Sequence, residues 1–246
     1  YYLLCKAWDT LYLIEKKFNV NKISPQNTDT VEGFSVIMPV YNMAYFIKRA
    51  ILSLKKQTYR NWELIIVNDG STDNLEEIIR DELIDPRIKY ITYPQNKGLG
   101  YALNKGLNEA KFLHVSYLPA DDFYYDHHLE KLKQTFDICK GAILVYSGIN
   151  YHDNDSFFLR DKIETTTMRP DYCLQLVQTA HKLTSDRWME RSEMVTENLF
   201  VMFWNKLIGK GIFVPTLQIT AKWTDHPYQR HKLCSENYGG NLYKYK

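Results

Sequence analysis

The chain has 246 residues, of which 45% are hydrophobic and 24% charged, and its formal net charge is +2. This composition is typical of a globular protein with a sizeable core, and the small net charge gives no reason to expect a nucleic-acid partner. No apolar run reaches the roughly 18–20 residues that cross a bilayer, which argues against a polymer synthase that forms its own membrane channel. The cysteines show no CxxC spacing and are expected to be reduced thiols in the cytoplasm.

Residues 1–33 precede the first strand pattern. Apolar and aromatic residues between Leu4 and Phe18 approximate one helical face, and residues 21–33 are polar, as in a linker. We expect a helix that packs on the main body. The alternative is a helix on a membrane surface, which its weakly basic polar face disfavours. The chain begins at Tyr1 rather than Met, so we expect upstream sequence to have been removed.

Buried-strand patterns alternate with helical patterns in the first half of the chain. The strands are expected at 34–40, 62–67, 88–93 and 112–118, with helices at about 42–56, 73–83 and 99–110. This alternation predicts a parallel sheet, because parallel strands need a crossover between them. Asn42 and Asp73 are the expected N-caps of the first two helices.

The second half has a less regular pattern. A helix at 126–140, with His127 and His128 on its surface, should precede a strand at 142–147. Residues 153–170 are polar and irregular. Helices are expected at 172–183 and 196–207, and an extended segment at 212–223. We divide the chain into residues 1–33, 34–150 and 151–246.

Polar residues follow each strand of the predicted parallel sheet, where ligands of such sheets bind. Asp121 and Asp122 are adjacent carboxylates, which favours Mg or Mn between them and a phosphate. The alternative for this pair is a turn or a helix cap. Asp69, before the flexible Gly70, can accept hydrogen bonds from a base or a ribose, or can form a simple turn.

Other residues on the same edge could complete a nucleotide site. Tyr41 can stack on a base or belong to the core, and Asn96, Lys97 and Gly98 can cradle a phosphate or form an ordinary loop. A dinucleotide-binding dehydrogenase is disfavoured, because Leu103 stands where GxGxxG needs its third glycine. No GxxxxGK[ST] motif is present, which disfavours a P-loop kinase or ATPase.

Four strings occur in an order and spacing that resemble family 2 glycosyltransferases of the GT-A fold. They are SVIMPVYN, LIIVNDGSTD, NKGLGYALNKGL and YLPADDFY. The resemblance covers residues 34–146 well and continues more weakly to about residue 211. It implies an α/β fold with a mostly parallel central sheet flanked by helices. Residues 34–150 would then bind the nucleotide sugar, and residues 151–246 the acceptor.

The resemblance also implies an activity. The expected reaction is a metal-dependent, inverting transfer of a sugar from a nucleotide-sugar donor to a hydroxyl of a glycan or lipid-linked glycan. UDP is the first choice for the nucleoside diphosphate of the donor. The expected cofactor is Mn or Mg, which would stabilise the departing diphosphate. Surface polysaccharide synthesis in the cytoplasm, with peripheral association at the inner face of the membrane, is the pathway that this family suggests.

Site residues carry over at matching positions. Glu197 is the expected catalytic base, with Glu193 and then Glu190 as alternatives. Asp122 is the metal ligand that the resemblance implies. Apart from the resemblance, the polar and aromatic segment after the last strand contains His226, which we expect to complete the metal shell. The residues expected to contact the nucleotide are Pro39, Tyr41, Asn42, Asp69, Asn96, Gly98 and Asp121.

Two departures from the family pattern leave alternatives open. Pro119 stands where the family often has the first Asp of Asp-x-Asp-Asp, and Asn198 where an Asp often follows the base. A non-catalytic module that binds nucleotide sugars is therefore the second hypothesis. A nucleotidyltransferase is disfavoured, because the chain has no glycine-rich basic signature early on. Residues 224–232, with Arg230, His231 and Lys232, either close over the diphosphate or form a solvated tail.

Overall fold

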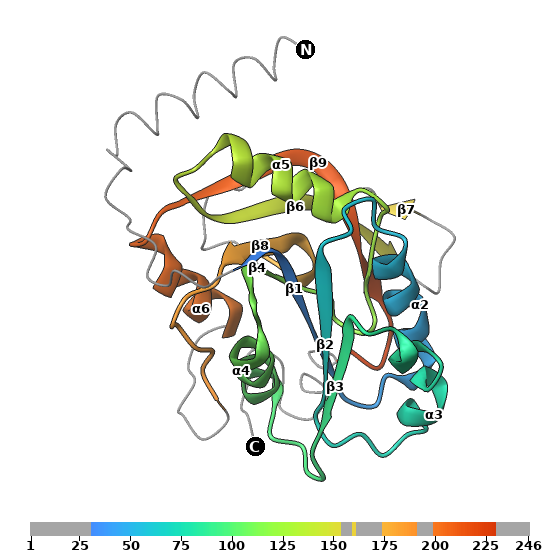
Figure 1. Cartoon of the computed structure of the whole chain (residues 1–246). Helices are drawn as coiled ribbons and strands as arrows, with labels where there is room; N and C mark the ends of the chain where they lie inside the picture. Colours follow the sequence, from blue (N-terminus) through green and yellow to red (C-terminus); the bar gives the residue numbers. More distant parts are fainter. Residues whose placement is uncertain (1–30, 154–158, 161–173, 191–198, 230–246) are drawn as a thin grey trace.

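A computed structural model describes residues 31–153, 159–160, 174–190 and 199–229 (Figure 1). The expected N-terminal helix lies outside the described residues. The described strands form one sheet in the order β3-β2-β1-β4-β8-β6-β9-β5, and β7 pairs with β6. No helix in these ranges is both long and apolar enough to cross a membrane.

The first half of the sheet is parallel, as the sequence predicts. The strands are β1 (Val31–Val40), β2 (Trp62–Asn68), β3 (Ile88–Thr92) and β4 (Phe112–Tyr117), and β1 lies between β2 and β4. The crossovers contain α2 (Ala44–Lys55), α3 (Leu75–Ile79) with the 3-10 helix η2 (Glu82–Ile84), and α4 (Leu99–Glu109). The strand β2 is buried along its whole length, as expected for a parallel strand covered on both faces.

Two boundaries in this half of the chain differ clearly from the sequence prediction. The first strand starts at Val31, so residues 31–33 belong to β1 rather than to a linker. The second helix does not run from 73 to 83, because α3 ends at Ile79 and a separate 3-10 turn follows. The expected caps are also wrong: Met43 and Asn74 precede α2 and α3, and neither makes a side-chain cap hydrogen bond.

The second half of the sheet is mixed. Its elements are β5 (Phe123–Tyr124), α5 (His128–Ile138), β6 (Ala142–Asp153), β7 (Leu159–Arg160), the 3-10 helix η3 (Leu176–Gln178), β8 (Thr179–Lys182), α6 (Leu199–Ile208) and β9 (Ile212–Asp225). The helix expected at 172–183 is wrong for its described part, because β8 pairs antiparallel with both β4 and β6. These sheet contacts override the local helical pattern. The predicted extended segment at 212–223 is confirmed as β9.

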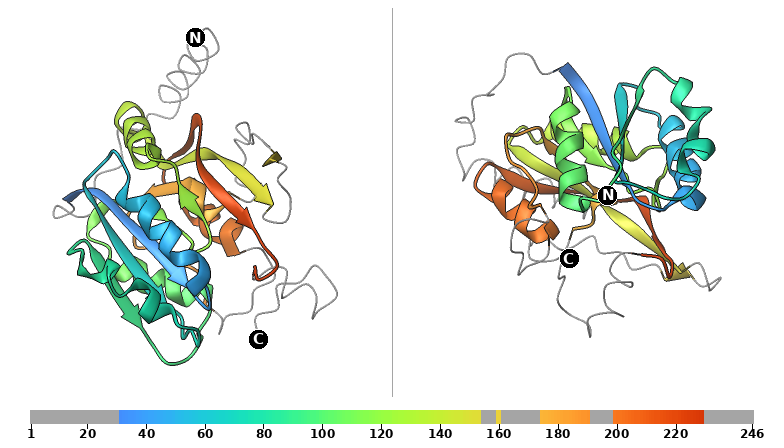
Figure 2. Two further views of the ribbon diagram at one scale, coloured as in Figure 1. Left: turned by 90° about the vertical axis from the view of Figure 1, so that its right-hand side faces the viewer. Right: turned by 90° about the horizontal axis from the view of Figure 1, so that it is seen from below.

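Helices cover both faces of the sheet (Figure 2). One core cluster contains apolar side chains of α2, α3 and α5, a second contains those of α4 and α6, and a small third joins Ala102 of α4 to Ile65 and Val67 of β2. His128, expected on the surface, is fully buried, because its ring stacks on Tyr124 at 3.9 Å and its Nδ1 lies 2.7 Å from Thr220 Oγ1. Burial lowers the pKa of His128 to about 3, so the ring is neutral at pH 7.

Candidate functional site

The polar segments that follow β1, β2, β3 and β4 meet at one edge of the parallel half, because these strands are neighbours and run the same way. Tyr41 is 44% exposed at this edge, whereas Pro39 lies buried within β1 and pairs in register with Val67. Of these two residues, Tyr41 is therefore the one whose side chain can meet a ligand.

Asp69 holds the loop after β3 against the end of β2. Its carboxylate accepts the backbone N–H groups of Lys97 at 2.7 Å and Gly98 at 2.8 Å. Asp69 itself is only 4% exposed. Gly70 has φ +73° and lies so close to this loop that a Cβ there would stand 2.7 Å from the Asn96 nitrogen. The structure thus brings together the predicted residues Asp69, Asn96 and Gly98.

A second set of hydrogen bonds joins the ends of β1 and β2. Asn42, with φ 53°, accepts the Thr72 N–H at 2.8 Å, and its own N–H donates to Ser71 Oγ at 3.0 Å. Asp73 Oδ2 accepts the Ala44 N–H at 2.8 Å. Asp73 therefore serves the start of α2 rather than the start of its own helix, which explains why both predicted caps are wrong.

The acidic pair after β4 is divided between two environments. Asp122 is buried, and its Oδ1 accepts the Thr224 N–H at 2.9 Å. The side chain of Asp121 is 19% exposed, and its Oδ2 lies 3.1 Å from His226 Nε2. Burial, followed by the charge of Asp121, raises the pKa of Asp122 well above its usual value, while the Thr224 N–H and Arg49 oppose this rise.

His226 reaches the acidic pair from the end of β9. Its ring packs on Phe46 of α2 with centroids 4.4 Å apart, and it is almost fully buried. His226 Nδ1 has no hydrogen-bond partner among the described residues. Asp121 and His226 thus form a carboxylate and imidazole pair between segments 105 residues apart in the sequence.

Sequence reasoning missed Arg49 and Thr224. Arg49 Nη2 donates to the Asp121 carbonyl oxygen at 2.6 Å and to Thr224 Oγ1 at 2.8 Å. Burial lowers the pKa of Arg49, and the charges of Asp122 and Asp121 oppose this effect. The one available signal is helical spacing: Arg49 shares a face of α2 with the buried residues Phe46 and Ser53, where a basic residue is unusual.

The expected base, Glu197, lies outside the described residues, as do Glu193, Arg230, His231 and Lys232. The alternative Glu190 is described. Its Oε1 accepts a hydrogen bond from Asn104 Nδ2 at 2.8 Å, and Asn104 also bonds both backbone groups of Trp188. Glu190 is therefore attached to α4 in the described structure.

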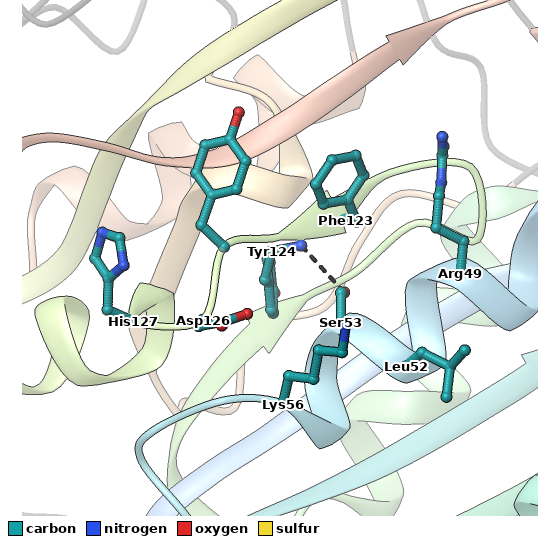
Figure 3. Close-up of a pocket in the computed structure, with 9 residues that line it drawn as sticks. Arg49, Leu52, Ser53, Lys56, Phe123, Tyr124, Asp126 and His127 are labelled. Carbon is teal, nitrogen blue, oxygen red and sulfur yellow. Dashed lines mark hydrogen bonds between the residues drawn. The ribbon is translucent and has the colours of Figure 1, made fainter.

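A cavity of about 680 Å³ lies between α2 and the segment that contains β5 (Figure 3). Arg49 and Phe123 form one end of it, and the guanidinium carbon lies 5.1 Å from the ring centroid of Phe123. Within the described parts of the chain, no group of three or more His, Cys, Asp and Glu side chains could hold a metal by itself. A cation at the Asp121–His226 pair would therefore need oxygen ligands from water or from a substrate.

Comparison with known families gives a clear match. The model of the family described as Glycosyl transferase family 2 matches residues 35–194. An uncharacterized glycosyltransferase of Haemophilus influenzae is 36% identical over 145 residues, which are 58% of this chain and 56% of the relative. Glycosyltransferase GlyG of Streptococcus pneumoniae is 30% identical over 185 residues, which are 74% of this chain and 58% of the relative. The chain thus spans little more than half the length of these two curated relatives.

Solved structures with similar architecture are more distant in sequence. S. aureus TarS 1-349 in complex with UDP-GlcNAc has a TM-score of 0.66 and 19% identity, over 80% of this chain and 60% of that one. Mannosyltransferase PcManGT from Pyrobaculum calidifontis, in complex with GDP-Man and Mn2+, has a TM-score of 0.61 and 14% identity, over 94% of this chain and 69% of that one. At these identities the likeness concerns the fold, and the fold class expected from the sequence is confirmed.

Proposed function

Because the chain belongs to glycosyl transferase family 2, we propose that it transfers a sugar from a nucleotide-sugar donor to a hydroxyl of a glycan or lipid-linked glycan. A UDP-sugar is our first choice of donor. The observation that carries the proposal is the Asp121–His226 pair, which follows β4 at the same edge of the parallel strands as the loop that Asp69 holds. Two structural neighbours, TarS in complex with UDP-GlcNAc and PcManGT in complex with GDP-Man, support a nucleotide-sugar donor.

The donor groups at the pair fit a divalent cation. Asp121 Oδ2 and His226 Nε2 lie 3.1 Å apart, close to the spacing of about 3 Å between neighbouring ligands of an octahedral ion with bonds of about 2.1 Å. Carboxylate oxygen suits Mg and Mn, and the imidazole favours Mn, because Mg prefers oxygen ligands. When bound, the cation would neutralise charge that develops on the departing diphosphate.

We assign the two carboxylates different roles. Asp121 is the more exposed and faces His226, so we propose it as the direct metal ligand with His226. Asp122, the ligand expected from the sequence, is buried and holds the Thr224 N–H. We therefore propose that Asp122 fixes the end of β9, which carries His226, and adds its negative charge to the site. Supporting groups of this kind orient ligands and raise metal affinity.

The nucleotide would lie along the same edge of the sheet, at the ends of β1 and β2. Tyr41 offers an exposed ring for the base, and Asp69 fixes the loop that contains Asn96 and Gly98, which we propose contacts the base or the ribose. Asn42 keeps the ends of β1 and β2 in register beneath it. Pro39 would act through the shape of β1, because its side chain is buried.

For the chemical step we propose inversion by a single displacement. Glu197 would take the proton of the acceptor hydroxyl as that oxygen attacks the anomeric carbon, and the nucleoside diphosphate would leave from the opposite face. Glu190 is the alternative within the described residues, and its hydrogen bond from Asn104 would have to yield. We place the reaction in the cytoplasm or at the inner face of the membrane, in surface polysaccharide assembly.

The first experiment tests the metal pair. UDP binding should be measured by calorimetry with and without Mn for the natural chain, Asp121→Asn, His226→Gln and Asp122→Asn. We expect Mn to strengthen UDP binding to the natural chain and to have little effect on the first two variants. Asp81→Asn, on an exposed segment, is the control. Equal Mn dependence in Asp121→Asn and the natural chain would move the ligand role back to Asp122.

The second experiment separates the enzyme from a binding module. Release of nucleoside diphosphate from a panel of UDP- and GDP-sugars should require Mn and should fall at least 100-fold in Glu197→Gln, because the amide keeps the shape of the side chain and removes its basicity. UDP binding should be unchanged in that variant. Glu190→Gln serves as the matched comparison. Donor binding without any turnover in the natural chain would favour the non-catalytic module.

A further inference from the structure

The end of β9 is tied to the turn after β4 through a single side chain of α2. Arg49 Nη2 donates to the Asp121 carbonyl at 2.6 Å and to Thr224 Oγ1 at 2.8 Å. Asp121 is the residue whose carboxylate faces His226, and Thr224 lies two residues before His226 in the sequence. One guanidinium nitrogen thus connects both sides of the pair.

The surroundings of Arg49 fix its guanidinium in place. Its guanidinium carbon lies 5.8 Å from the Phe46 ring centroid and 5.1 Å from that of Phe123. Phe46 is the same ring on which His226 packs. Arg49 Nε is buried and has no hydrogen-bond partner among the described residues. Burying this unpaired N–H costs free energy, which the two hydrogen bonds of Nη2 offset.

We propose that Arg49 is a positioning residue, which holds the end of β9 against the turn after β4 and so sets how His226 meets Asp121. We call the contact between the end of β9 and the turn after β4 the joint. A second hydrogen bond supports it, since Asp122 Oδ1 accepts the Thr224 N–H at 2.9 Å. Thr224 therefore contributes a hydroxyl to Arg49 and an amide to Asp122. The expected effect of Arg49 on metal binding rests on the proposed function. Its role in holding β9 against the turn after β4 does not.

The joint can be tested without metal or donor. Hydrogen exchange should be measured for a peptide that covers residues 221–229 in the natural chain, in Arg49→Met and in Thr224→Val. Methionine keeps apolar packing against Phe46 and Phe123 and removes both donated bonds, while valine removes the hydroxyl with little change of shape. Exchange in this peptide should rise about tenfold in both variants, and exchange in the β1 and β2 peptides should not change.

Metal affinity supplies the second measurement. For UDP with Mn, both variants should lower the apparent Mn affinity about tenfold and leave metal-free UDP binding within twofold, as losses of supporting groups do. The double variant should be no weaker than either single one, because both remove the same link. Arg49→Lys should recover part of the affinity, and Lys48→Ala, exposed on the same helix, should match the natural chain.

The two measurements fail in different ways. If the natural chain shows no Mn dependence of UDP binding, the proposed metal site is wrong, and the exchange experiment still decides the role of Arg49. If Arg49→Met leaves exchange at 221–229 unchanged, the positioning role is overturned, whatever the natural chain binds. An equal loss of UDP affinity with and without Mn would also overturn it, since that result indicates a general structural role.

Discussion

On the β1–β3 side of the sheet, polar side chains join one loop to the next, whereas on the β8–α6 side aromatic rings hold the elements together. Asp69 and Asn42 bind backbone groups across strand ends. On the other side, Trp188 stacks on Phe203 with centroids 4.0 Å apart, and Trp204 packs edge-on against both. The first arrangement fixes the loops that would bind a donor, and the second supplies core volume.

The two arrangements meet at β4. Tyr117, on the last residue of β4, bonds His181 Nε2 at 2.7 Å and accepts the Trp188 indole N–H at 3.3 Å. Four residues later the same segment reaches Asp121. The edge that carries the site therefore depends on a few directional hydrogen bonds, while a large apolar cluster supports the strands that carry this edge.

The largest expected effect tests the aromatic side. Trp188→Ala removes a buried indole, and it should lower the free energy of unfolding by about 3–5 kcal/mol in urea titrations. Trp188→Phe keeps the stacking and should cost much less. If the aromatic side supplies core volume and the polar side fixes the binding loops, the folded fraction of Trp188→Ala should still bind UDP within a few-fold of the natural affinity. A loss below about 1 kcal/mol would show that the aromatic cluster is not the main source of stability on that side.

The next effect concerns the contact between the two sides. A Cβ on Gly100, in the first turn of α4, would stand 1.8 Å from the backbone oxygen of Met189, so Gly100→Ala must push the two segments apart. We expect a loss of about 1–3 kcal/mol of unfolding free energy. Gly209→Ala is the matched control, since a Cβ there meets nothing within 4 Å. Equal stability of the two variants would mean that the segment at Met189 can move away from α4 without a measurable loss of unfolding free energy.

The parallel half could be predicted from the sequence because each strand carries its own apolar pattern and its own turn residues. The helix expected at 172–183 was wrong, because β8 is defined by pairing with β4 and β6, which no local pattern encodes. The caps failed for a related reason: Asp73 bonds a helix 29 residues away. Asp69 at the end of β2 does contact Gly98, and Asp121 after β4 does contact His226. Arg49 could not be chosen from the sequence, because its role depends on contacts with residues 72 and 175 positions away.

The buried histidines predict the pH dependence of stability. Burial lowers the pKa of His128 to about 3 and that of His181 to about 4, below the ordinary value of 6.5. Below pH 6.5 the unfolded chain therefore binds protons that the folded chain does not, and the free energy of unfolding should fall as the pH drops toward 4. Each ring contributes up to about 1.4 kcal/mol per pH unit. The raised pKa of Asp122 acts in the opposite direction.

His128→Gln isolates one of these contributions. Its urea-derived stability should fall less steeply between pH 6 and pH 4 than that of the natural chain, by up to about 1.4 kcal/mol per unit. The comparison of slopes cancels any loss of packing against Tyr124, because that loss does not depend on pH. Parallel slopes would mean that His128 is protonated in the folded state, in conflict with its burial.

The smallest effect tests the polar side at a single hydrogen bond. Asp73→Ala removes the carboxylate that accepts the Ala44 N–H, and loss of such a cap should cost about 1 kcal/mol of unfolding free energy. Asp81→Ala, exposed and without a cap hydrogen bond, is the control. Because α2 carries both Phe46, which packs on His226, and Arg49, a loosened first turn should also lower the Mn dependence of UDP binding a few-fold. A variant that loses stability but keeps its full Mn dependence would show that the start of α2 supports the fold alone, and that the middle of the helix holds the site without it.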